Sequence, residues 1–301
     1  MAAEGGNIVR YIYRGEEGEV TPREATHITI AARNIPPNAF RGRHNIIEVI
    51  CHEDVERIGQ FAFCGCPRLR RVIMPGVKIV EWNAFLKCEA LEDVECGKVE
   101  IIGATSFASC ESLRSINIPS ARIVGNSAFG GCKAAVDVKF GSKLEEIASL
   151  AFNKCSSLER ITLPLKDGFI TGDDKFTGCE QLKHIDLVEG AELHETFIAA
   201  LQLKEWRIDL SYEIGSINWI LPNARAGGWG DEGPWNDGEK ARVIRKWIRS
   251  VREKINRYKA QHSRILDDAE TTLQLVLPQD IATNNILPFL ALPSYSLEGG
   301  I

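Results

Sequence analysis

The sequence has no uninterrupted apolar run that approaches the length of a membrane span. A transmembrane helix needs roughly 20 predominantly apolar residues. The N-terminal stretch MAAEGGNIVRYIYRGEEGE also lacks a basic segment followed by an apolar one, which a secretory signal peptide requires. We therefore expect no membrane span and no signal peptide.

The sequence also lacks the common motifs of catalysis and of metal binding. Its six histidines share no metal-ligand spacing, and Cys64-Gly-Cys66 has no second Cys or His pair at zinc spacing. The glycine-rich run 227–238 is not followed by the Lys-Ser/Thr of a phosphate-binding loop, and its acidic residues do not follow calcium-loop spacing. We expect a protein that is not an enzyme and that needs no cofactor and no metal.

What the chain does contain is a repeat. The pattern F-x-x-C occurs six times, with steps of 22, 22, 22, 23 and 24 residues between the phenylalanines. One such repeat is too short to bury its own apolar face, so neighbouring repeats must stack. The six pairs, which we predict to form the repeat core, are Phe63/Cys66, Phe85/Cys88, Phe107/Cys110, Phe129/Cys132, Phe152/Cys155 and Phe176/Cys179.

Each repeat continues into a short alternating segment. An apolar residue follows three positions after the cysteine, and two more apolar residues then alternate with polar ones, as in a strand with one buried face. Pro or Gly ends most of these segments, as Pro75 and Gly97 do. The pattern predicts a parallel sheet of short strands, with loops or short helical pieces on the opposite side.

The repeats resemble a known family. Segments 55–75 (VERIGQFAFCGCPRLRRVIMP) and 99–119 (VEIIGATSFASCESLRSINIP) are similar to the BspA-type leucine-rich repeat, and the similarity extends over roughly 35–197. The resemblance implies an α/β repeat solenoid and a role in adhesion or interaction. Segments 247–262 and 284–295 resemble the helical tail that follows such repeats in uncharacterised proteins of unicellular algae, which implies no activity.

The cysteine pattern bears on the cellular compartment. The chain has nine cysteines, and six of them recur at one repeat position, so stacking would place them in a row and not in pairs. A buried cysteine behaves as a small apolar residue. Free thiols without an export signal favour the cytosol or the nucleus.

We predict the following organisation. An N-terminal cap covers residues 1–30, with two β segments at 8–13 and 26–30 that form a hairpin. The solenoid follows at 31–197, with about seven or eight turns, of which the first is degenerate and includes Phe40. The remaining parts are a first helix at 198–222, a flexible linker at 223–238, a long heptad helix at 239–277 and a tail at 278–301 that either folds back as a cover or acts as a docking motif.

Both predicted helices carry an apolar seam, and Pro222 ends the first one. Two such helices joined by a short linker pair most simply as an antiparallel hairpin. The seam of the first helix comprises Leu203, Trp206, Leu210, Ile214, Ile217 and Leu221. That of the second comprises Ile244, Ile248, Val251, Ile255, Tyr258, His262, Ile265 and Ala269.

The outward positions of the strands form two predicted rows of candidate partner-binding residues. Their charges are of mixed sign, so they create no uniform field for nucleic acid or membrane. Two interpretations remain open, a solvated face with cross-strand charge pairs and a surface for a protein or peptide. The candidates are Arg71, Ile73, Asp93, Glu95, Ser115, Asn117, Asp137, Lys139, Arg160, Thr162, His184 and Asp186.

The long helix concentrates positive charge. Residues 239–264 carry ten basic side chains against Glu239 and Glu253, a net +8 in a chain of net −5. Three explanations remain open: contact with nucleic acid or acidic lipid, an acidic partner, or docking against the protein's own acidic body. We expect an interaction scaffold or adaptor with an unidentified protein or peptide partner, and the rivals are nucleic-acid binding through 239–264 and self-assembly as a coiled coil through 239–277.

Overall fold

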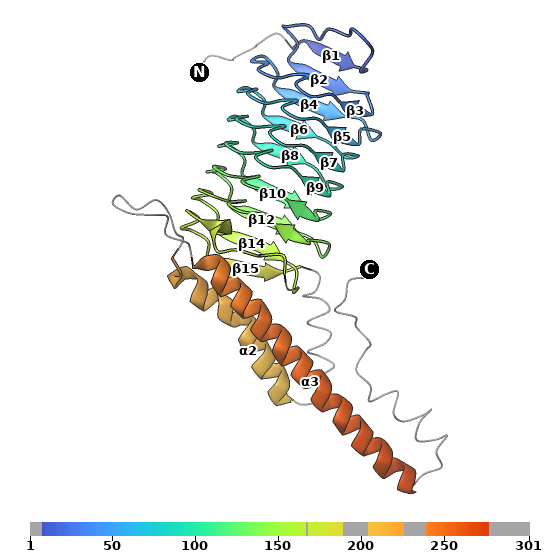
Figure 1. Ribbon diagram of the computed structural model, residues 1–301, viewed down its shortest axis with the longest axis vertical. Coiled ribbons are helices and arrows are strands. Elements are labelled where there is room, and N and C mark those ends of the chain that lie inside the picture. Colours follow the sequence, from blue (N-terminus) through green and yellow to red (C-terminus); the bar gives the residue numbers. More distant parts are fainter. Residues whose placement is uncertain (1–7, 167, 189–203, 226–238, 277–301) are drawn as a thin grey trace.

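The computed structural model describes residues 8–166, 168–188, 204–225 and 239–276. They form a solenoid of parallel strands with about seven turns, followed by two long helices at its C-terminal end (Figure 1). The predicted α/β repeat solenoid with a C-terminal helical hairpin is therefore confirmed. The predicted last turn near Phe197 and the tail at 278–301 lie outside the described residues.

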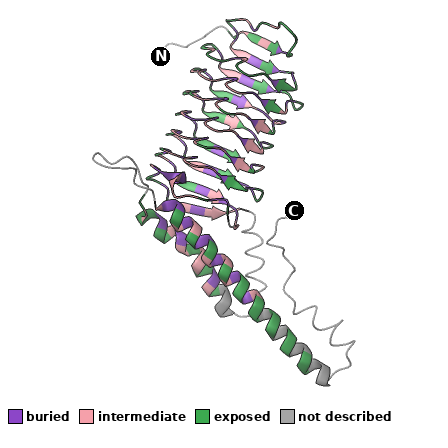
Figure 2. Ribbon diagram, in the orientation of Figure 1, coloured by how far each residue is buried: buried purple, intermediate pink, exposed green. Residues whose placement is uncertain are grey.

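The main sheet runs along one side of the solenoid in two parts. The first part has five strands, β1 (Arg10–Tyr13), β2 (His27–Ile30), β4 (Glu48–Cys51), β6 (Arg71–Ile73) and β8 (Asp93–Glu95). The second part has four, β10 (Ser115–Ile118), β12 (Asp137–Phe140), β14 (Arg160–Leu163) and β15 (His184–Leu187). Buried and exposed residues alternate along most of these strands (Figure 2), as the sequence pattern predicts.

A second parallel sheet occupies the opposite side, where we expected loops or short helical pieces. It has six two-residue strands, β3 (Asn34–Ile35), β5 (Arg57–Ile58), β7 (Ile79–Val80), β9 (Ile101–Ile102), β11 (Ile123–Val124) and β13 (Glu146–Ile147). The expectation was wrong because two residues are too few to show a strand period. These segments form a sheet because neighbouring turns stack in register.

The N-terminal segments also differ from the prediction. β1 and β2 form, but they pair in parallel, with Arg10 opposite His27, and the Ala31 amide donates to the Tyr13 carbonyl at 2.8 Å. The predicted hairpin is therefore wrong. A connection of about a dozen residues, such as the one between these strands, is long enough for the crossover that a parallel pair needs. The two strands extend the main sheet of the solenoid.

The phenylalanines form one continuous column inside the solenoid. Phe40 starts it and confirms the degenerate first repeat, because its ring stacks on Phe63 at 4.9 Å between centroids. Five further stacked pairs follow, down to Phe152 on Phe176 at 5.7 Å, and adjacent rings are tilted by no more than 11°. All seven rings are buried. Each turn thus covers the ring of the preceding one.

The cysteines form a second column, and all nine in the chain are free. In each repeat the thiol donates to the carbonyl of a phenylalanine one turn earlier, from Cys66 to Phe40 at 3.2 Å through to Cys179 to Phe152 at 3.0 Å. The predicted row of unpaired cysteines is confirmed. Each of these carbonyls also accepts the backbone amide three residues later in its own turn, as Phe63 does from Cys66 at 3.2 Å, so the thiol is a second donor that links consecutive turns.

Two antiparallel helices close the C-terminal end. α2 (Lys204–Ile220) continues into the 3₁₀ turn η2 (Leu221–Asn223), and α3 (Lys240–Val276) packs along α2, as the antiparallel contacts of Asp209 with Tyr258 and of Glu213 with Ser250 show. Of the predicted seams, Leu210, Ile217 and Leu221 on the first and the five positions from Ile244 to Tyr258 on the second are buried, and Ile214 is half-buried. The remaining seam side chains are outside the described residues.

The hairpin takes the place of the next repeat. The outward-facing amide of Ile185 in β15 donates to Oδ1 of Asn218 in α2 at 3.0 Å. The Lys240 ammonium is buried and donates to the carbonyls of Leu182, at 2.6 Å, and Leu221. The Asn218 side chain thus pairs with a strand amide that would otherwise face an additional turn, and Lys240 links the loop before β15 to the hairpin, so the hairpin covers this edge of the sheet.

The thiol column predicts the reactivity of the cysteines. Burial raises the pKa of Cys51, Cys66, Cys96 and Cys132 to about 12, so these thiols hold little reactive thiolate near neutral pH. Cys64 is half-buried and the other eight cysteines are buried. Titration of the native protein with an aromatic disulfide reagent should therefore modify one thiol rapidly, and Cys64→Ser should remove that fast phase. Several fast thiols in the native protein would contradict the stacked column.

Lys240 predicts a pH dependence of stability. Burial lowers the pKa of Lys240 below its usual 10.5, so the folded state loses this proton at a lower pH than the unfolded state does. The unfolded state then binds more protons, and the stability due to this group rises with pH up to about 10.5. Urea unfolding should show wild type gaining stability relative to Lys240→Met from neutral pH upward. Lys246→Met controls for the loss of one positive charge from α3, and a difference that falls with pH would contradict the assignment.

Candidate partner-binding surface

The candidate surface is the outward face of the main sheet. The strand pairing places the twelve predicted residues in the two expected rows, because their register is continuous within each part of the sheet. Arg71 and Asp93 lie in one row of the first part, beside Ile73 and Glu95 in the other. The remaining eight candidates form the corresponding rows on the second part, which are Ser115, Asp137, Arg160 and His184, and Asn117, Lys139, Thr162 and Asp186.

The two rows are not continuous from end to end. No strand pairing joins β8 to β10 among the described strands, so the sheet is interrupted between Glu95 and Ser115. Between β6 and β8, the Met74 amide donates to the Glu95 carbonyl at 2.9 Å. At the equivalent place between β8 and β10, the Asn117 carbonyl lies 3.7 Å from the thiol of Cys96. The candidate residues therefore lie on two hydrogen-bonded parts of the face, although β8 and β10 remain neighbours in the stack (Figure 1).

Most charged residues of the face pair with one another. Arg71 contacts the carboxylates of Glu48 at 3.9 Å, Asp93 at 3.3 Å and Glu95, and the hydrogen bond to Glu95 raises its pKa. In the second part, two further pairs form, Arg160 with Asp186 at 2.7 Å and Lys139 with Asp137 at 3.1 Å. The contacts of Arg71 and Arg160 are the cross-strand charge pairs that the first of the two interpretations predicts, whereas Lys139 and Asp137 pair within β12. Exposed pairs of this kind contribute about 0–1 kcal/mol each.

An apolar column lies beside the charged row at the N-terminal end of the face. Ile12, Thr29, Ile50 and Ile73 occupy directly opposed positions on β1, β2, β4 and β6. Ile12 and Ile50 are 47% and 38% exposed, and Ile73 is half-buried. With parallel strands about 4.8 Å apart, the column is roughly 14 Å long. We call these four residues the aliphatic column.

Sequence reasoning missed the first part of this column. Ile12 and Thr29 belong to segments that we assigned to a hairpin cap and not to the sheet. The signal was present, since RYIY (10–13) and HITI (27–30) alternate in the same way as the later strands. What the sequence does not contain is the parallel register that places Ile12 opposite Thr29.

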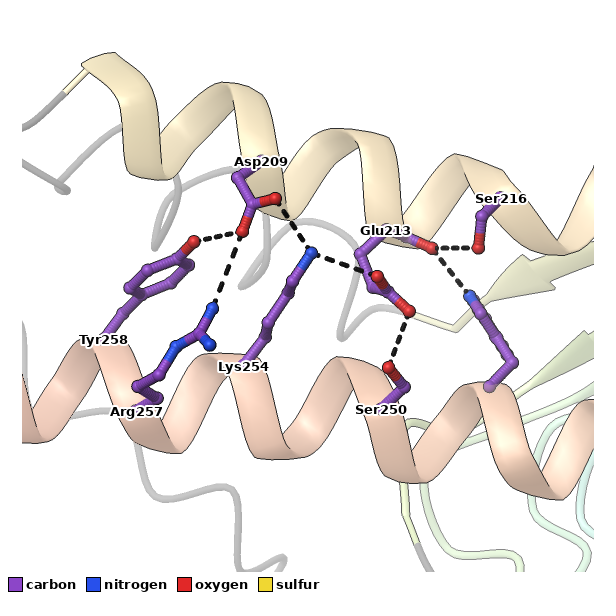
Figure 3. Close-up of polar contacts among 8 residues, drawn as sticks. Asp209, Glu213, Ser216, Ser250, Lys254, Arg257 and Tyr258 are labelled. Atoms are coloured by element: carbon purple, nitrogen blue, oxygen red, sulfur yellow. Dashed lines mark hydrogen bonds and ion pairs between the residues drawn. The ribbon is translucent and has the colours of Figure 1, made fainter.

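The basic residues of α3 are largely engaged within the chain. Lys254 contacts Asp209 at 2.9 Å and Glu213 at 3.0 Å on α2, and the Tyr258 hydroxyl donates to Asp209 (Figure 3). The hydrogen bonds from Tyr258 and Lys254 lower the pKa of Asp209. Arg245 bonds to the Gly172 carbonyl and to Asp173, just before the 3₁₀ turn η1 (Asp174–Phe176). Arg245, Lys254 and Arg257 thus pair with acidic groups outside α3, so docking within the chain accounts for part of the charge asymmetry.

The described part of the chain has neither a metal site nor a membrane helix. Within it, no cluster of three or more His, Cys, Asp or Glu side chains is placed to hold a metal ion. Of the two long helices described, neither is apolar enough over a sufficient length to cross a bilayer.

Comparison with solved structures finds other leucine-rich repeat proteins. One from T. pallidum is 23% identical, covers 54% of this chain and 70% of its own, and has a TM-score of 0.40. One from Bacteroides ovatus is 19% identical, with 56% and 62% coverage and a TM-score of 0.37, so this chain spans less than two thirds of that protein. A cell surface protein from Faecalibacterium prausnitzii is 16% identical, with 54% and 79% coverage and a TM-score of 0.22.

No curated protein matches the chain. The model of the BspA type leucine rich repeat region, with six copies, matches residues 33–123 and 100–216, which is more than half of the sequence. The match ends at residue 216, so the resemblance of the C-terminal segments to algal repeat proteins is not confirmed. The period, the stacked turns and this match together show that the chain belongs to the family of BspA-type leucine-rich repeat proteins.

Proposed function

We propose that the protein is a non-enzymatic interaction scaffold and that it binds a protein or peptide through the N-terminal part of its outward sheet face. The observation that carries this proposal is the aliphatic column, which holds three isoleucines and one threonine in register on the outward side of four paired strands. The repeat family supports both parts of the proposal, because leucine-rich repeat proteins are typically interaction scaffolds and typically not enzymes.

Rigid display is the physical mechanism. The strands that carry the column are hydrogen-bonded to one another and packed on the buried phenylalanine stack, so the side chains are ordered before a partner arrives. Binding to a preorganised surface costs less ordering entropy, which leaves more of the contact energy as affinity. An apolar segment of a partner lying across the strands would bury the column.

The charged row beside the column would set orientation. Arg71 is surrounded by the carboxylates of Glu48, Asp93 and Glu95, so this part of the face has more negative than positive groups. A partner with a basic residue next to its apolar segment therefore fits best. Such a charged rim contributes mainly to the association rate and to specificity.

The alternative of nucleic-acid binding through 239–264 is not favoured. Lys240 is buried and donates to two carbonyls, and Lys254 and Arg245 are engaged by acidic groups of the same chain. A helix that contacts phosphates needs those cations on a free face. The seam of α3 is likewise buried from Ile244 to Tyr258, which argues against self-assembly through that stretch.

A reducing compartment, cytosol or nucleus, is part of the same proposal. Nine free cysteines support it, because the buried thiol column has no disulfide to gain from an oxidising environment. Imaging of the tagged protein would test it, and accumulation in the secretory pathway would contradict it.

The binding surface is tested with two matched double variants. Ile50→Asp/Ile73→Asp places two carboxylates in the aliphatic column, and Asn117→Asp/Thr162→Asp places two on the second part of the same face. Affinity purification from the source cells should lose a partner with the first variant only. With that partner purified, calorimetry should show at least about tenfold weaker binding, or roughly 1.4 kcal/mol.

The control variant distinguishes a local effect from a general one. Both variants add the same charge to the same sheet, and circular dichroism should show that both remain folded. If partners survive the first variant, or are lost equally with both, the aliphatic column is not the binding surface.

A further inference from the structure

α2 carries a second apolar seam on its outer side. Ile208, Tyr212 and Trp219 are 59%, 78% and 83% exposed, which makes Trp219 the most exposed large apolar side chain among the described residues. Together with Gly215 they are spaced by 4, 3 and 4 residues, so they lie on one side of the helix in the spacing of a coiled-coil seam. We call these four residues the outer seam.

The outer seam faces away from α3 and from the end of the solenoid. At 100° per residue it lies opposite the side formed by Leu210, Ile217 and Leu221, which is buried against α3 and the end of the solenoid. The described residues of the outer seam also include no charged side chain. Among the α2 side chains that the structure describes, residues 208–220, the charged ones are Asp209 and Glu213, and both bond to α3 (Figure 3).

Exposed aromatic residues without neighbouring charges are the composition of an interface core. Charged residues are depleted there, whereas Trp and Tyr are enriched. An isolated exposed apolar residue needs no explanation, but a contiguous patch of several hundred Å² marks an interaction site. Since covered Trp and Tyr side chains bury roughly 150–250 Å² each, the outer seam presents roughly 400–500 Å².

The order of residues along the seam is self-complementary. Positions 208 and 219 and positions 212 and 215 are symmetric about the same point, midway between residues 213 and 214. If two copies of α2 cross antiparallel at that point, Ile208 of each meets Trp219 of the other, and Tyr212 meets Gly215. A side chain added at Gly215 would meet nothing within 4 Å, so the helix surface there is open to a large residue from outside.

We infer that the protein forms a homodimer in which two copies of α2 pair antiparallel through their outer seams. An isologous interface requires one patch to be complementary to itself, and the outer seam has this property, with large residues opposite small or aliphatic ones. The two hairpins then form a four-helix arrangement with α2 of each chain at its centre. This dimer uses α2, and not the self-assembly through helix 239–277 considered from the sequence.

The size of the seam bounds the affinity. Two seams with the flanking Ser211, Ser216 and Ile220 would bury about 1,000 Å² in total, which is the lower limit for a specific interface. We therefore expect a dissociation constant in the micromolar range. A dimer of this kind would double the number of sheet faces, and two weak contacts with a repetitive partner would reinforce each other.

Sedimentation equilibrium of the full chain tests the inference. Between about 1 and about 100 µM the wild type should shift from monomer toward dimer. Tyr212→Lys should weaken the dimer at least tenfold, because it places a cation in the seam. Val20→Lys is the matched control, since Val20 is 79% exposed outside the helical hairpin and its replacement should leave the mass unchanged.

Gly215→Gln separates association from folding. Replacing an exposed helical glycine favours the helix of each protomer, so the melting temperature measured at low protein concentration should rise. The new side chain fills the space for Tyr212 of the second copy, so association should weaken. A wild type that remains monomeric at about 100 µM, or a dimer that withstands both variants, would overturn the inference.

Cysteine cross-linking tests the orientation in a Cys64→Ser background. Chains carrying Ile208→Cys and chains carrying Trp219→Cys, when mixed and mildly oxidised, should form an intermolecular disulfide. Neither chain should do so alone, because the two equivalent positions are about 16 Å apart along an antiparallel pair. Cross-linking of either chain with itself would overturn the antiparallel arrangement.

Discussion

Each turn of this solenoid buries the aromatic ring of the turn before it, and the rest of the structure depends on that contact. A repeat of 22 to 24 residues has too little chain to enclose a core of its own. The phenylalanine rings stack at 4.9 to 5.7 Å, and the thiol of the next repeat donates to the backbone of the phenylalanine below. One column supplies apolar contact and the other gives buried carbonyls a second donor, so both follow from the same stacking.

A stack of repeats has two ends, and the two ends of this solenoid have different structures. At the C-terminal end, Asn218 bonds to the Ile185 amide of the last strand, and Lys240 bonds to the Leu182 carbonyl in the loop before it. At the N-terminal end, β1 is the outermost strand of the described sheet, and its exposed Ile12 begins the aliphatic column. The C-terminal end therefore carries the helical hairpin, whereas the N-terminal part of the described sheet carries the surface that we propose binds a partner.

The hairpin combines closure of the solenoid with presentation of a surface. Its inner side uses the basic residues of α3 and the acidic residues of α2 to hold the two helices together (Figure 3). Over the described side chains 208–220, the outer side of α2 carries no charge and exposes two aromatic residues. The two acidic residues of this stretch, Asp209 and Glu213, are on the side that pairs with α3, which leaves an uncharged apolar seam on the outer side.

The sequence alone determined the features that depend on local periodicity. The F-x-x-C spacing predicted the buried columns from Phe63 to Cys179, the alternation predicted the main strands, and the heptad pattern predicted α3 from about 239 to 277, which the structure places at Lys240–Val276. Periodicity suffices there because each residue has the same surroundings as the equivalent residue one repeat or one helical period away. The twelve candidate residues could be placed on one face for the same reason.

Only the tertiary structure decided which segments pair and where pairing stops. The parallel entry of β1, the second sheet of two-residue strands and the gap between β8 and β10 all depend on contacts between turns, and no single turn records them. The pairing of Lys254 with Asp209 and the exposure of Trp219 depend in turn on which side of α2 packs against α3. Sequence period sets which residues can be buried together, whereas the ends and edges of the stack decide which of them remain on the surface.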